Sequence, residues 1–396
     1  MVPSYSRKAI SGWNNYPCMV TSHKMNENEM GYRGSKSVLV TSTVKEQRVD
    51  GSGCKKPLHL RCILMGFERN YQIKIPSKQL NKVYFSTQTS LNNKLNPWFI
   101  TGFADAEGCF SFAIKPNAKS KLNWRTSPLF VIKLHIKDLA ILELIKNTLT
   151  VGKIRLNGIN SVQYVVESIK ELQVIVDHFN NYPLVTEKAS DYLIFKQCFE
   201  IIKQREHLME KGLLKLIGLK SSLNWGLSDN LKEAFPNVAF VSRPEYNFKG
   251  IPDPFWVAGF TSGDGSFHLN IKKSDTNISH RVSLRFSIHL NIRDAEVLKG
   301  LVTYFNLNKS SNKFYQENQY VSKSNNTITF AITKTTEINK IIIPFFEKYT
   351  VQGLKSLDFA DFKKVAMMIG AKEHLTIEGL NRILEIKLNM NKHREW

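Results

Sequence analysis

One stretch of this chain occurs twice, at residues 96–110 and 253–267. Each copy opens with an Asn or Asp followed by proline, which favours the start of a helix. Small residues then recur four positions apart, so that another backbone can come close along that side of the helix. An acid follows each strip of small residues, and helices packed strip to strip would bring the two acids together. The strips contain Gly102 with Ala106 and Gly259 with Gly263, and the acids are Glu107 and Asp264.

The likeness of the two copies extends far beyond these helices. Matching residues follow at separations of 156 and then 167, which places an insertion in the second copy near residues 310–326. Duplication of a whole unit is a stronger signal than any single motif. We therefore expect a leader at 1–95, a first half at 96–224, a linker at 225–252 and a second half at 253–396. The matched landmarks are Asp138 with Asp294, Lys188 with Lys355, and His207 with His374.

Apolar and polar residues alternate with period two after each duplicated helix, which is typical of strands with one buried and one free face. The apolar side must pack on helices, which we expect at 139–149, 190–206, 295–305 and 357–370. Each half thus reads helix, two strands, helix, two strands and further helix. This order predicts an α+β fold.

The chain carries 55 Lys and Arg against 34 Asp and Glu, a formal net charge of +21. Such an excess, spread along the sequence, favours a polyanion as partner. The sequence offers neither a long apolar run for a membrane span nor a basic amphipathic helix, so we expect no membrane partner. Its five cysteines lack metal-ligand spacing, which indicates reduced thiols and argues against a zinc site.

The polar side of the predicted strands is rich in side chains that can contact phosphates and base edges, and it contains few acids. Plain solvation is the ordinary role of such residues. Here, however, they begin two residues after each predicted acid, so a nucleic acid on this face would lead into the same site. The candidate binding residues are Ser111, Lys115, Lys133, His135, Arg155, His268, Asn270, Lys272, Arg285, Ser287 and His289.

Both duplicated stretches resemble the LAGLIDADG motif of homing endonucleases, in the single-chain form with two motifs. The resemblance implies two pseudo-symmetric αββαββα halves, each with a saddle-shaped antiparallel four-stranded sheet laid along the DNA major groove. It also implies a monomer that cuts both strands of double-stranded DNA at a long target, which should be asymmetric because the halves differ in sequence. The second copy departs from the motif, since Ser262 stands where the first has Asp105. We expect this to alter local capping and not the chemistry.

The chemistry expected of such an enzyme is metal-assisted phosphodiester hydrolysis. Paired carboxylates can hold divalent ions, which generate the nucleophile and neutralise charge on the phosphate. Mg²⁺ suits this role, because it binds through one or two carboxylates and phosphate oxygens. Glu107 and Asp264 are the predicted ligands; as a structural alternative they merely end their helices, where a carboxylate is unfavourable. By resemblance, the carbonyls of Ala106 and Gly263 are further ligands.

Lys188 and Lys355 occupy matching positions just before two of the predicted long helices. By resemblance, a basic residue here polarises the attacking water or stabilises the transition state, which makes both lysines candidate catalytic residues. The alternative is a solvated lysine at a helix start, where the helix dipole disfavours cations. His207 and His374 read as structural residues of a helix turn.

The leader contains 15 Lys and Arg against 5 Asp and Glu and is rich in Ser, Asn and Gly, which predicts a mostly disordered segment. A basic, acid-poor N-terminus is typical of a mitochondrial presequence. The resemblance offers a second explanation, because many members of the family are encoded within introns of organelle genes, sometimes continuous with the upstream exon. Both explanations predict a mitochondrial protein, and we favour the organelle-encoded one.

Different classes of function remain open at this point. The first is a site-specific, Mg²⁺-dependent DNA endonuclease that initiates intron homing. The second is a maturase that binds intron RNA and assists splicing, alone or in addition, through basic surface away from the groove-facing strands. A third is a DNA-binding protein without catalysis. Incubation with Mg²⁺ and an intronless exon-junction DNA separates these classes, since only the endonuclease cuts it.

Overall fold

The computed structural model of the chain describes residues 94–224, 226–273, 280–307, 317–391 and 394. These residues belong to one compact unit. The predicted disordered leader lies outside the described residues except for its last two positions. Residues 308–316, which overlap the predicted insertion, lie outside them as well.

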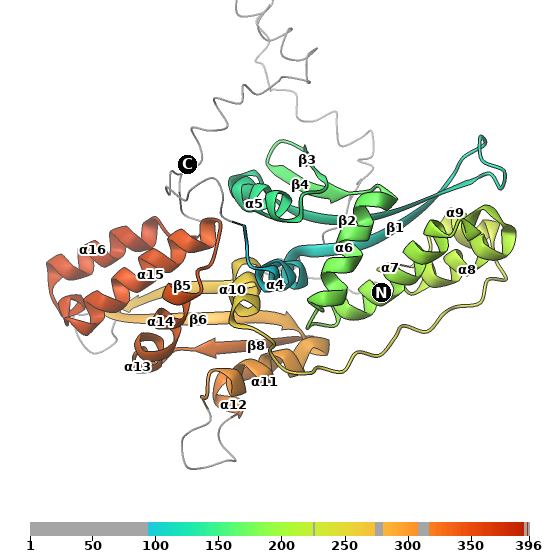
Figure 1. The fold of residues 1–396 in the computed structure, drawn as a ribbon. Helices are drawn as coiled ribbons and strands as arrows, with labels where there is room; N and C mark the ends of the chain where they lie inside the picture. The colour runs from blue at the N-terminus through green and yellow to red at the C-terminus, as the bar shows by residue number, and fades with distance from the viewer. Residues whose placement is uncertain (1–93, 225, 274–279, 308–316, 392–393, 395–396) are drawn as a thin grey trace, which may run out of the picture. The chain divides into compact units, whose positions relative to one another are not determined.

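The first half runs from a buried central helix through a four-stranded sheet to a group of helices (Figure 1). Asn96 caps the first helix through its side chain, which accepts a hydrogen bond from the Trp98 amide at 2.9 Å. Its elements in chain order are α4 (Pro97–Glu107), β1 (Gly108–Pro116), β2 (Trp124–His135), α5 (Leu139–Leu149), β3 (Lys153–Leu156), β4 (Ser161–Val166), α6 (Ile169–Asn181), α7 (Lys188–Lys203) and α8 (Glu210–Ser221).

The second half repeats this order (Figure 1). Asp253 caps its first helix in the same manner and accepts from the Phe255 amide at 2.7 Å. Its elements are α10 (Pro254–Asp264), β5 (Gly265–Lys273), β6 (His280–Asn291), α11 (Ala295–Tyr304), α12 (Glu317–Tyr320), β7 (Val321–Ser324), β8 (Thr327–Ile332), α13 (Thr335–Glu337), α14 (Ile343–Lys348), α15 (Leu354–Gly370) and α16 (Ile377–Leu388), with a π-helical turn between α13 and α14.

Each half contains one antiparallel sheet, with strand order β1-β2-β4-β3 in the first and β5-β6-β8-β7 in the second. The register sets polar residues opposite one another on one face: His268 lies opposite Arg285, and Gln163 lies between Lys133 and Arg155. None of the described strands contains an Asp or Glu. The sheets therefore present Lys, Arg and His side chains without intervening carboxylates.

The apolar faces of the two sheets are covered by the same arrangement of aromatic rings. Phe110 of β1 lies 5.1–5.4 Å from four other rings, measured between ring centroids. Phe267 of β5 occupies the matching position, at 5.2–5.5 Å from its four neighbours. The neighbours of the first are Phe130, Phe179, Tyr192 and Phe195; those of the second are Phe286, Phe346, Phe359 and Phe362. The duplication read from the sequence thus extends into the core.

The two halves meet through α4 and α10, which lie side by side (Figure 1). A Cβ added to Gly102 would lie 2.0 Å from the Trp256 carbonyl oxygen, and one added to Gly259 would lie 2.0 Å from that of Phe99. Any side chain at either position would collide with main chain. The small residues therefore face each other across the pair, as the spacing predicts.

Residues 226–252, the described part of the predicted linker, pack on both halves. Within them α9 (Asp229–Ala234) buries Leu231, and Phe235 packs on Trp124 with ring centroids 5.4 Å apart. Further along, the Tyr246 hydroxyl donates to the Leu184 carbonyl at 3.1 Å. Phe248 then lies against Gly300 of α11, where an added Cβ would meet its ring at 2.4 Å.

The predicted α+β fold with two sheets is confirmed, with differences at helix ends. Helices α7 and α15 begin at Lys188 and Leu354, earlier than predicted, so Lys188 and Lys355 lie within the first turns and not before them. At the start of each of these helices, a backbone amide donates a hydrogen bond to an aspartate of the other half, and this bond stabilises the earlier start. Among the described residues, no helix is long and apolar enough to span a membrane.

Gly102→Ala should destabilise the protein by more than about 2 kcal/mol, because the added methyl group forces α4 and α10 apart. Gly370→Ala is the matched control, since an added Cβ at that helix end has nothing within 4 Å. Alanine is the better helix former there, so the control should change the free energy of unfolding by at most about 1 kcal/mol. Urea unfolding measures both, and equal stability of the two variants would contradict this packing.

Candidate active site

Glu107 and Asp264 end α4 and α10, and the packing of these helices brings them together. A Cβ added to Gly263 would lie 3.1 Å from Cγ of Glu107 and 3.6 Å from its Oε1. Burial raises the pKa of Glu107 to about 7, with a further increase from the charge of Asp264. Burial likewise raises the pKa of Asp264 to about 6. Two carboxylates in one partly enclosed place resist ionisation, which a cation would relieve.

Lys188 and Lys355 lie beside these acids, and the positive charge of each favours ionisation of both carboxylates. The Lys188 ammonium donates to the carbonyls of Ala104 and Ala106, each at 3.1 Å, and thus covers the end of α4. Lys355 donates instead to the carbonyl of Gly265, just beyond α10. The two lysines therefore occupy matching places with different partners.

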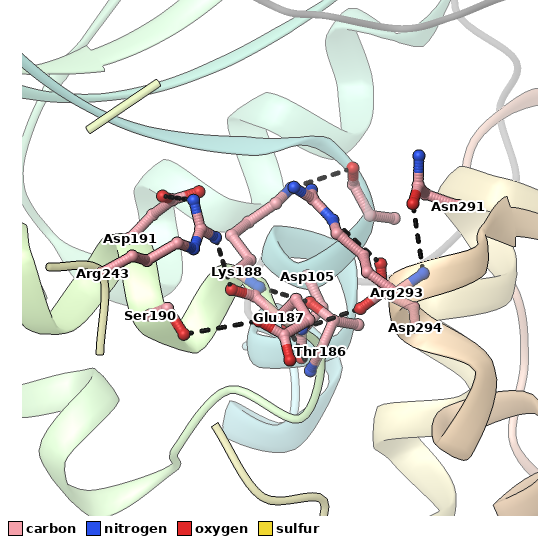
Figure 2. A network of polar contacts seen from close by, with 11 residues as sticks. Asp105, Thr186, Glu187, Lys188, Ser190, Asp191, Arg243, Asn291, Arg293 and Asp294 are labelled. Atoms are coloured by element: carbon pink, nitrogen blue, oxygen red, sulfur yellow. Dashed lines mark hydrogen bonds and ion pairs between the residues drawn. The ribbon is translucent and has the colours of Figure 1, made fainter. Parts of the chain in front are cut away.

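Asp105 lies on α4, two residues before Glu107, and has a structural role. Its carboxylate is 4% exposed and accepts from the Val185 amide, from the amide and hydroxyl of Thr186, and from Nε1 of Trp256, at 2.7–3.2 Å. Through Thr186 it ties the loop before α7 to α4 (Figure 2), and through Trp256 it ties α4 to α10. Burial raises its pKa, and these donors oppose the shift.

Ser262 occupies the matching position in the second half, where fewer hydrogen-bond donors surround the side chain. Its hydroxyl donates to the Ala258 carbonyl at 2.8 Å and accepts from the Gln352 amide at 3.0 Å. The position that matches Thr186 is Gly353, which has no hydroxyl, and the position that matches Trp256 is Phe99, which has no N–H group. A serine therefore suffices for the local hydrogen bonds, which differ from those of Asp105 as expected; that the chemistry is unaffected stays a prediction.

The site's oxygen donors fit a hard divalent cation. Within the described part of the chain, no group of three or more His, Cys, Asp or Glu side chains forms a metal site. Two carboxylates remain, together with the carbonyls of Ala106 and Gly263, and the Ala106 carbonyl already accepts from Lys188. Mg²⁺ commonly uses one or two carboxylates and completes its shell with water and phosphate oxygens. The donor set fits such an ion with a phosphate present.

A cavity of about 610 Å³ opens beside Glu107 and is lined mostly by residues of the second half. Glu107, Gly263 and Lys355 are among its lining residues. Beyond them the wall is formed by His268, Asp138, Asp358, Lys387, Asn391 and Arg394. Ser266 and His268, the first polar residues of the second sheet, thus line the same cavity as Glu107.

Most of the predicted DNA-contacting residues lie on the polar sheet faces, but Ser287 does not present its side chain. It is 3% exposed in the middle of β6, with its hydroxyl 3.4 Å from Nε2 of His289, so its predicted role as a surface contact is wrong. Arg155 is accessible but forms an ion pair with Glu167. The other predicted contacts are half-buried or exposed: Ser111, Lys115, Lys133, His135, His268, Asn270, Lys272, Arg285 and His289.

The start of each lysine-bearing helix is capped by an acid of the opposite half. Asp294, before α11, accepts from the Glu187 amide at 2.8 Å (Figure 2). Asp138, before α5, accepts from the Leu354 amide at 2.8 Å. The sequence marked both acids only as landmarks of the repeat. Their matched positions after a polar strand were the one signal that could have pointed to the site.

The linker adds a residue that the sequence did not single out. Arg243 donates to the Glu187 carbonyl at 3.0 Å, and its other terminal nitrogen lies 2.8 Å from Asp191 on α7 (Figure 2). At the end of the second half, Arg394 makes the matching contact with Asp358 of α15 at 3.0 Å. Each lysine-bearing helix is therefore braced by one arginine that lies C-terminal to the helices of the same half.

The LAGLIDADG endonuclease family matches residues 100–199 and 257–366, which lie in the two duplicated halves. The chain belongs to the LAGLIDADG endonuclease family. The single-chain form with two motifs and the DNA endonuclease function predicted from them are thereby confirmed. The match covers most of both central helices, both sheets and both lysines of this endonuclease.

Individual relatives agree with this assignment. The probable intron-encoded endonuclease 3 of Neurospora crassa is 40% identical over 403 residues, which cover 96% of this chain and 74% of that protein. The LAGLIDADG meganuclease I-CpaMI, solved bound to uncleaved DNA, is 49% identical with a TM-score of 0.71, over 76% of this chain and 100% of that one. I-SmaMI, solved bound to uncleaved target with calcium ions, is 39% identical with a TM-score of 0.70, over 76% of this chain and 100% of that one.

The raised carboxyl pKa values make the metal-free endonuclease less stable as pH rises. The folded state binds these protons more tightly than the unfolded state, so their stabilisation is complete below about pH 4 and is lost as pH passes 6 to 7. Glu107→Gln should remove its share of this loss, of the order of 2–3 kcal/mol at pH 8. Urea unfolding in EDTA at pH 5 and pH 8 measures the difference. Glu296→Gln, at an exposed position on α11, should leave the pH slope unchanged; an equal slope in both variants would contradict the burial of Glu107.

Proposed function

We propose that this endonuclease makes a double-strand break at a long, asymmetric DNA target by Mg²⁺-assisted hydrolysis, and acts as a monomer. The observation that carries the proposal is the meeting of two acids, one from each half, at the ends of α4 and α10. One carboxylate per half suits a duplex in which each strand carries one scissile phosphate. Since both halves are in one chain, no second copy is needed to complete the pair.

Glu107 and Asp264 would hold the metal through their carboxylates, with the carbonyls of Ala106 and Gly263 as additional donors. When bound, the cation supplies a nucleophile at neutral pH and neutralises charge that develops on the phosphate. The chain's own part is to keep the two acids close and partly shielded from water. Proximity of these groups in fixed positions is what strengthens their electrostatic effect.

Lys188 and Lys355 would act as catalytic residues on the phosphate side of the site. Each ammonium lies beside both carboxylates, held by main-chain carbonyls rather than by an ion pair. Such a group can donate to a phosphate oxygen as negative charge builds up on it. Because the lysines have different carbonyl partners, the two strands need not be cut at the same rate.

The polar sheet faces would read the target. Their strands contain Lys, Arg, His, Asn and Ser but no carboxylate, so the phosphate backbone meets no fixed repulsion there. Arg285 and His268 face each other at the cavity side of the second sheet, where they can reach base edges. Burial lowers the pKa of His268 and of His289, which favours neutral rings that both donate and accept.

We further propose that the protein is mitochondrial and encoded by an intron reading frame. The basic composition of its first 95 residues and the fungal intron-encoded relatives support this. The maturase alternative is not favoured, since the similar proteins are described as endonucleases and both acids are present. RNA binding by basic surface away from the sheets would be an addition to cleavage.

Glu107→Gln and Asp264→Asn should each reduce double-strand cleavage by at least about 10³-fold while DNA binding is retained. Each replaces a charged carboxylate ligand of the metal by a neutral amide of similar shape. Cleavage is measured with Mg²⁺ on a plasmid carrying the intronless exon junction, and binding by gel shift with Ca²⁺. Glu296→Gln on α11 is the control and should cut normally. Full cleavage by either site variant would exclude that carboxylate from the site.

Arg285→Ala should relax discrimination at one or two adjacent base pairs by about 1–3 kcal/mol, because a side chain that contacts a base edge carries sequence information. Lys272→Ala, at the far end of the same sheet, should instead weaken binding to all targets and reduce the salt dependence. Affinities for a library of single-base variants at two salt concentrations distinguish the two behaviours. Uniform weakening by Arg285→Ala would assign that residue to the backbone.

A further inference from the structure

Both candidate catalytic lysines stand at a position that helix electrostatics disfavour. Lys188 is the first residue of α7 and Lys355 the second residue of α15. A cation in the first turn faces the positive end of the helix dipole and unbonded amide groups. Something must offset this cost if the ammonium groups are to stay beside the carboxylates.

The offset comes in each case from the opposite half. Asp294 of the second half accepts from the Glu187 amide, the residue directly before Lys188. Asp138 of the first half accepts from the Leu354 amide, the residue directly before Lys355. In both pairs the carboxylate caps a free helix amide and adds negative charge where the lysine needs it. The contacts are reciprocal, as the pseudo-twofold repeat requires.

The fit around Asp138 is close. Gly353 precedes the helix with φ +68°, and a Cβ there would lie 2.5 Å from Oδ1 of Asp138. The chain thus uses a glycine at the place where the foreign carboxylate enters. On the other side, Oδ2 of Asp294 lies 3.5 Å from Nε of Arg293, while Oδ1 is left for the helix (Figure 2). Each carboxylate is aimed by its surroundings at one amide.

We propose that Asp138 and Asp294 are positioning residues for catalysis, each holding the lysine of the other half in place. This rests on the proposed roles of Lys188 and Lys355. Its consequence is that neither half can set its lysine correctly alone. The packing of α4 on α10 then brings the two acids together, and it also brings Asp138 and Asp294 against the helix starts that carry the two lysines.

The test is a pair of double-mutant cycles with single-turnover cleavage under excess enzyme, so that slow rates remain measurable. Asp138→Asn should lower the rate at least about tenfold in the wild-type and Lys188→Met backgrounds, because the neutral side chain still accepts from the helix amide but no longer offsets the charge of Lys355 at the helix start. In the Lys355→Met background the same change should cost less than about twofold. Asp294→Asn should likewise lower the cleavage rate in the wild-type and Lys355→Met backgrounds, and should have little effect on the rate only in the Lys188→Met background. Glu143→Gln on α5 and Glu296→Gln on α11 are the charge-matched controls and should not slow cleavage.

Separate readouts distinguish the failures. DNA affinity and thermal unfolding of the Asp→Asn variants should stay close to wild type, since asparagine keeps an acceptor for the helix amide. Hydrogen exchange in the first turn of α15 should accelerate in Asp138→Ala and less in Asp138→Asn. Equal losses in both lysine backgrounds, or no loss, would overturn the positioning role. Full activity of both Lys→Met variants would instead refute the lysine roles on which it rests.

Discussion

The contact between the main chains of α4 and α10 is the interaction on which the rest of the site depends. Gly102 and Gly259 each lie against a carbonyl oxygen of the other helix, closer than any side chain permits. The direction of both helices then places their C-terminal ends together, and each of these ends in an acid. The contact of Gly102 and Gly259 with the opposite main chain thus sets how close the two acids at the helix ends come to each other.

Bringing two carboxylates together at helix C-termini is unfavourable by itself, and the structure shows how that cost is distributed. Burial raises both pKa values, to about 7 for Glu107 and about 6 for Asp264, and the charge of Asp264 adds to the shift of Glu107. Two lysines offset part of the negative charge, and Asp138 and Asp294 in turn stabilise those lysines at their helix ends. Charges therefore alternate outward from the pair of acids, and each layer comes from a different part of the chain.

Much of this was readable from the sequence because the chain repeats itself. Glu107, Asp264 and the strips of small residues have local signatures, and Lys188 and Lys355 were found by their matching positions. The caps by Asp138 and Asp294 were not predicted, since a hydrogen bond between residues 216 positions apart has no local pattern. Ser287 was misplaced because alternation reports which face a residue is on and not whether neighbouring side chains cover it. Arg243 in the linker was missed because its contacts with α7, like those of the two aspartates, join residues far apart in the sequence and have no local pattern.

The difference between Asp105 and Ser262 shows how the two halves diverged without losing their common geometry. Asp105 serves four donors, one of which is the indole of Trp256 on the partner helix. Ser262 serves one amide, because its neighbours at the matching positions are a phenylalanine and a glycine. The number of donors present decides which residue is needed. Divergence at this motif position therefore follows from its surroundings, and it leaves the acids at the helix ends where they were.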